Sequence, residues 1–168
     1  MLIKSFFVSI YLAIVLLAPT AVAQKAARIA GFQAHLFNSK TGALSDDMLA
    51  KGAPEMGNVP AGDFASVSTF IVVKVELGKE APIPQNAKVR LVATESGSMP
   101  FAVKPKKESD KIILNRASGL GPVNAEGNTF VGFWLASTGC KSISLKATLL
   151  GLKDKPSLTE VLPFACYE

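Results

Sequence analysis

Residues 143–149, with the sequence ISLKATL, alternate strictly between apolar and polar side chains. Successive side chains of a β-strand point to opposite faces of the sheet, so this pattern predicts a strand with one buried and one wet face. Residues 67–77 alternate in the same way, although Phe70 and Val72 interrupt the polar side. Both stretches are typical of antiparallel sheets that are covered on one face.

Shorter apolar runs predict further strands, and residues rich in turn formers (Gly, Pro, Asn and Asp) separate them. About seven strands in all predict an all-β fold: a single antiparallel β-sandwich, immunoglobulin-like in broad architecture. A small jelly roll or a barrel is the main alternative. The immunoglobulin Cys-Trp-Cys order is missing, because both cysteines follow Trp134. The additional strands are expected at residues 28–38, 88–94, 112–115, 129–135 and 158–166.

The aromatic strand at 129–135 is apolar on both faces. Such a strand either lies centrally, with both faces covered, or leaves one face for a partner. Gly132 in its middle indicates a bulge or a close backbone approach. We expect Trp134, the only tryptophan, to be a core anchor.

One short helical turn is predicted between Ser45 and Gly52. Ser45 can cap it, Asp46 and Asp47 favour the positive end of its dipole, and Gly52 can close it. The turn interrupts residues 39–66, a long stretch with little strand pattern, and stretches of this kind are usually functional or mobile.

The chain begins with a pattern typical of a secretory signal peptide at residues 1–23. Lys4 precedes an apolar run at 6–18, and Ala21-Val22-Ala23 supplies the small residues of a cleavage site. Residues 24–168 would then form one exported domain, periplasmic or secreted, with no membrane span after cleavage.

Cys140 and Cys166 are the only cysteines, and in an oxidising compartment they predict a disulfide. Their midpoint falls in the expected turn at residues 151–156, so a symmetric hairpin would set the two cysteines opposite each other. The same register pairs Ser144 with Leu162, a wet position with an apolar one. A bulge at Gly139 or Pro163 would repair this mismatch.

The charge and motif content argue against an enzyme or a nucleic-acid binder. The formal net charge of +5 includes Lys4 of the signal peptide, and the remaining excess is mild. His35 is the only histidine, and neither a G-x-S-x-G nucleophile elbow nor a dinucleotide-binding loop is present. We therefore expect a non-catalytic protein without a cofactor or a metal.

The function expected from these features is binding of a protein or an envelope component through loops at the ends of the sandwich. Phe64 and Phe101 are the aromatic candidates for this contact. Lys104, Lys106 and Lys107 form a basic loop that attracts an anionic surface. The sequence leaves the partner and the oligomeric state open.

Two alternatives remain. The chain resembles chaperone–usher pilins in its length, signal peptide, all-β character and penultimate Tyr167. That resemblance implies an incomplete sandwich that receives a strand from the next subunit of a surface fibre. The second alternative is a periplasmic copper-binding protein, whose ligands would come from His35 and from Met48, Met56 or Met99.

Overall fold

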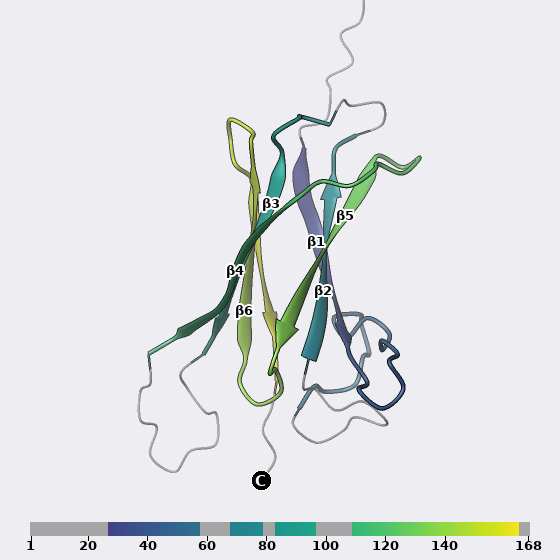
Figure 1. Ribbon diagram of the computed structural model, residues 1–168, viewed down its shortest axis with the longest axis vertical. Helices are drawn as coiled ribbons and strands as arrows, with labels where there is room; N and C mark the ends of the chain where they lie inside the picture. Colours follow the sequence, from purple (N-terminus) through teal and green to yellow (C-terminus); the bar gives the residue numbers. More distant parts are fainter. Residues whose placement is uncertain (1–26, 58–67, 79–82, 97–108, 165–168) are drawn as a thin grey trace, which may run out of the picture.

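The computed structural model describes residues 27–57, 68–78, 83–96 and 109–164. These residues form seven strands and no helix, arranged as two antiparallel sheets (Figure 1). One sheet has the order β1-β2-β5 and the other the order β4-β3-β6-β7. The predicted all-β, sandwich-like fold is thereby confirmed. The strands are β1 (Arg28–Leu36), β2 (Ser68–Glu76), β3 (Lys88–Glu95), β4 (Lys111–Gly119), β5 (Asn128–Ala136), β6 (Ile143–Leu150) and β7 (Ser157–Leu162).

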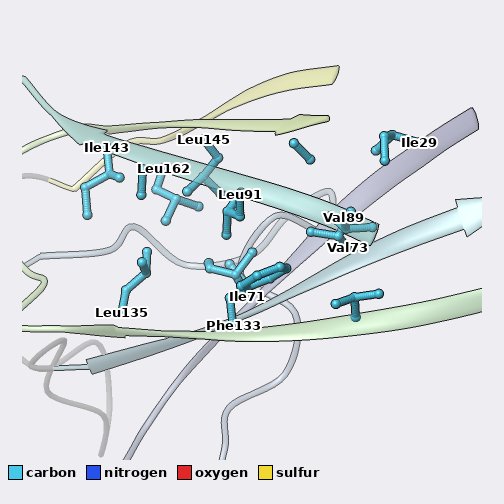
Figure 2. Close-up of a cluster of buried hydrophobic side chains, with 14 of the residues drawn as sticks. Ile29, Ile71, Val73, Val89, Leu91, Phe133, Leu135, Ile143, Leu145 and Leu162 are labelled. Atoms are coloured by element: carbon cyan, nitrogen blue, oxygen red, sulfur yellow. The ribbon is translucent and has the colours of Figure 1, made fainter. Parts of the chain in front are cut away.

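The core lies between the two sheets, and alternate residues of the strands fill it. Figure 2 shows Ile71 and Phe133 from the three-stranded sheet, and Leu91 from the four-stranded sheet, pointing into the same space. In β6 the apolar positions are buried and the polar positions between them are exposed or half-buried. The alternation of residues 143–149 therefore has the physical cause that the sequence suggested.

The predicted signal peptide lies outside the described residues and stays a prediction. Within the described part of the chain, no helix is long and apolar enough to cross a membrane.

The first strand, β1, lies at the edge of its sheet and pairs only with β2 among the named strands. A register shift between Ile29 and Gly31 places one extra residue in β1. Such a bulge reverses which side chains face the core, because the side-chain period of a strand is two. This explains why the first strand shows so little alternation in the sequence.

The predicted helical turn at Ser45–Gly52 is wrong, because these residues cover the outer edge of β1 instead. The Ser45 hydroxyl accepts a hydrogen bond from the Leu36 amide at 2.9 Å, and the Ser45 amide donates to the Leu36 carbonyl at 2.9 Å. One Asp47 carboxylate oxygen accepts from the Ala34 amide at 2.9 Å. The polar side chains that resembled a helix cap thus accept hydrogen bonds from backbone amides of β1, about 10 residues earlier in the chain.

Replacing Asp47 by alanine is expected to lower the free energy of unfolding by about 1–3 kcal/mol, since it strips the acceptor from partly buried amides. The same carboxylate oxygen accepts from both the Ala34 and the Leu49 amides. Urea unfolding of Asp47→Ala, with Asp47→Asn as the control that keeps an acceptor oxygen, measures the effect. Equal stability of Asp47→Ala and the wild type would show that hydrogen bonds to the Asp47 carboxylate do not stabilise the edge strand β1.

The last hairpin joins β6 and β7 through residues 151–156, as predicted, but its register differs by one residue from the symmetric one. Ile143 pairs with Leu162 and Ser144 with Val161, so buried positions face buried positions. Beyond β7, the Phe164 amide donates to the Leu162 carbonyl at 3.0 Å, a tight turn around Pro163. The described pairing of β6 and β7 runs without a register shift, so it contains no bulge, and Pro163 lies in a turn just after the paired residues.

Candidate functional site

Strand β5 presents large side chains to both sides of its sheet. Its inward residues are buried, and Phe133 has an exposed fraction of 4%. Its outward residues include Phe130, exposed by 48%, and Trp134, exposed by 44%. The prediction of Trp134 as a core anchor is therefore wrong: β5 leaves its outer face uncovered in the described structure.

The exposed rings of β5 belong to a larger cluster, which we call the aromatic face: Phe37, Phe70, Phe130 and Trp134, on the outer side of the sheet β1-β2-β5. Phe70 lies directly opposite Trp134 in the register of β2 and β5. The centroids of these two rings are 6.2 Å apart at an interplanar angle of 47°. Phe37, just after β1, packs edge-on against Trp134 with a centroid distance of 5.2 Å and an angle of 71°. Contacts of this kind hold the rings in fixed orientations without burying them.

Gly132 makes room for one of these rings. A Cβ atom at this position would lie 2.4 Å from Cζ of Phe70, so the ring lies across the glycine. The register between β2 and β5 runs without a shift from Ser68–Ala136 to Glu76–Asn128. The close approach predicted at Gly132 is thus made by a side chain from β2, and the alternative of a bulge is wrong.

Charged groups lie at the end of the same sheet that carries Phe130. Arg28 and Glu76 form an ion pair at 2.7 Å, and Lys74 lies opposite Phe130 in the register. His35 lies opposite Phe70, and its Nδ1 is 2.9 Å from the Ser45 carbonyl oxygen. The aromatic face is therefore an apolar patch with a polar border, which is how protein-binding surfaces are commonly composed.

The predicted loop site falls outside the part of the chain that the structure describes. Phe64 lies in residues 58–67, and Phe101, Lys104, Lys106 and Lys107 lie in residues 97–108, all outside the described residues. Cys140 is half-buried and is not a free thiol. Cys166 also lies outside the described residues, so its bond to Cys140 stays a prediction.

The residues considered as copper ligands are distributed between the core and the edge of the sheet. Met48 and Met56 belong to the hydrophobic core, with exposed fractions of 9% and 2%, and Met99 lies outside the described residues. One nitrogen of His35 contacts a backbone carbonyl. In the described part of the chain, no three His, Cys, Asp or Glu residues group as metal ligands would.

An uncovered face of the strand at 129–135 was one of the two predicted alternatives, but the complete aromatic face was not predicted, although two signals pointed to it. Phe70 and Val72 break the polar side of the β2 pattern, and residues 129–135 are apolar on both faces. Since β2 and β5 are neighbours, these two irregularities lie on the same outer surface. No protein-family model and no curated protein matches this sequence.

Proposed function

We propose that the chain is an exported, non-catalytic binding protein that recognises its partner with the aromatic face. The observation that carries the proposal is the exposure of Phe130 and Trp134 on the outer side of a sheet whose inner side fills the core. Leaving such rings in water is unfavourable, and exposed apolar patches with polar borders mark interaction sites. Tryptophan in particular dominates the energy of many protein interfaces.

A protein partner fits the aromatic face better than a polymer with a flat face does. The rings of Phe37 and Phe70 are inclined to that of Trp134 by 71° and 47°, so they do not form a common plane. Rings held at different angles present both edges and faces, against which apolar side chains of another protein can pack. Contact to an envelope surface through the sequence-predicted candidates, Phe64, Phe101 and the basic Lys104, Lys106 and Lys107, remains a second predicted route.

Two further parts of the proposal concern the fold. The order β1-β2-β5 and β4-β3-β6-β7 resembles the constant-type immunoglobulin arrangement, except that β4 pairs with β3 instead of β5. We therefore describe the sandwich as an immunoglobulin-like variant with a switched fourth strand. The pilin-like alternative is less well supported, because strands of the chain itself bury core residues such as Leu36, Ile71 and Leu91 completely.

The proposal is tested by capturing envelope proteins of the source cells on immobilised mature chain and measuring the affinity of each purified candidate. Trp134→Ala is expected to weaken binding of the true partner by about 10- to 100-fold, the effect of removing an interface hot spot. Val161→Ala is the matched control: Val161 has an exposed fraction of 49% but lies on β7 of the other sheet.

An equal loss of affinity in both variants, or an affinity unchanged by Trp134→Ala, contradicts the proposed site. Binding to purified envelope polysaccharide in place of any protein would instead assign the aromatic face to a glycan. Circular dichroism of each variant confirms that the comparison is made between folded proteins.

A further inference from the structure

The four edge strands of the two sheets differ in how they are protected against pairing with another strand. The described part of β1 has a bulge and is covered by Ser45 and Asp47. Strand β4 has a register shift with its neighbour and carries two cations, while β7 is short and is followed by Pro163. Bulges, charges, proline and short length are the usual ways of blocking an edge.

Strand β5 has none of these features beyond its first residue, Asn128, whose carbonyl accepts from the Asn124 amide at 2.8 Å and whose amide donates to Asn124 Oδ1 at 2.9 Å. Its nine residues, NTFVGFWLA, contain no charged side chain and no proline, and its register with β2 is uninterrupted. Among the described strands it has a neighbour on one side only. A long, regular, apolar edge of this kind is a template for strand addition.

The hydrogen-bond pattern identifies which groups of β5 are open. The Leu77 amide donates to the Gly127 carbonyl at 2.9 Å, just beyond the paired residues. Because hydrogen-bonded and non-hydrogen-bonded pairs alternate in an antiparallel ladder, the odd-numbered residues of β5 face β2. The amides and carbonyls of Phe130, Gly132 and Trp134 therefore point to the open side, and their side chains lie on the outer face.

We propose that a second copy of this chain occupies this edge, with the two β5 strands antiparallel about a two-fold axis at Gly132. In that register Phe130 lies opposite Trp134 of the second copy, and Gly132 lies opposite its own equivalent. Aromatic cross-strand pairs stabilise sheets, and no like charges meet, because β5 is uncharged. A two-fold interface must be self-complementary, and β5 satisfies this condition with its own sequence.

The dimer goes beyond the proposed binding function. It would join two three-stranded sheets into one six-stranded sheet, with both aromatic faces on the same side. Two adjacent faces bind a partner that has two sites more tightly than one face does, because the second contact is made within the complex. The interface is a single strand pair, so the dimer is expected to dissociate on dilution.

Sedimentation equilibrium of the mature chain tests the dimer with a matched pair of variants. Phe130→Pro and Phe130→Ala both remove the ring, but only proline removes the amide that points to the open side. Since two-fold symmetry removes that hydrogen bond twice, Phe130→Pro is expected to dimerise on the order of 30-fold more weakly than Phe130→Ala. A dimer equally strong in both variants overturns the proposal.

Hydrogen exchange on the wild-type chain tests the same dimer without a substitution. The amides of Val131 and Phe133 bond to β2 and should stay protected at every protein concentration. The amides of Phe130, Gly132 and Trp134 should be protected only at concentrations where the dimer forms. A chain that stays monomeric at about 1 mM, with these three amides exchanging freely, excludes the second copy as the occupant.

Discussion

Phe133→Ala is expected to lower the free energy of unfolding by about 3–5 kcal/mol, whereas Trp134→Ala should lower it by only about 1 kcal/mol. The two residues are neighbours in β5, but their side chains lie on opposite faces of the sheet. Phe133 is 4% exposed within the core, so its removal leaves a cavity between the sheets. Trp134 is 44% exposed on the outer face, so its removal costs ring contacts with Phe37 and Phe70 and opens no cavity between the sheets.

Urea unfolding followed by far-ultraviolet circular dichroism measures both variants without relying on tryptophan fluorescence. The pair is its own control, since each variant removes one large aromatic side chain from the same strand. A larger loss of stability for Trp134→Ala than for Phe133→Ala would mean that the two faces of β5 are assigned the wrong way round.

Removing the predicted disulfide is the second change expected to lower the free energy of unfolding strongly. The Cys140→Ser/Cys166→Ser variant is expected to be less stable by about 3.5 kcal/mol, because the bond closes a loop of about 27 residues in the unfolded chain. The observed hairpin brings the flanks of both cysteines together: Cys140 precedes Ile143, Cys166 follows Leu162, and Ile143 pairs with Leu162.

Urea unfolding of the oxidised wild type and of the double variant gives this difference directly. Wild-type protein reduced with dithiothreitol should unfold like the double variant, which controls for the loss of the thiol groups themselves. Two thiols that react with iodoacetamide in the exported, unreduced chain would show that no disulfide forms.

The local alternation of apolar and polar residues predicted most of the strands. All seven strands begin within one residue of the positions that the sequence suggests, and in most of them the inward residues face a core while the outward residues face water. Strand β4 is longer than expected, since an edge strand with exposed residues on both sides shows no clean period. The predicted hairpin register is wrong by one residue. The spacing of the cysteines does not determine the register, whereas the pairing of buried Ile143 with buried Leu162 does.

Long-range contacts explain what the sequence could not show. Ser45 and Asp47 match a helix cap locally, but their hydrogen bonds go to Leu36 and Ala34 of β1. Trp134 resembles a core anchor in the sequence. A strand that is apolar on both faces does not reveal which of them the second sheet covers. The aromatic face also requires knowing that β2 and β5 are neighbours, and their separation in the chain hides this.

Collisional quenching of the single tryptophan by acrylamide tests most directly whether the aromatic face is open and binds the partner. We expect the Trp134 fluorescence of the free, folded chain to be quenched readily, and to be protected once the captured partner is added. Fluorescence that resists the quencher in the free protein and becomes accessible only on unfolding would place the indole in the core and contradict the account.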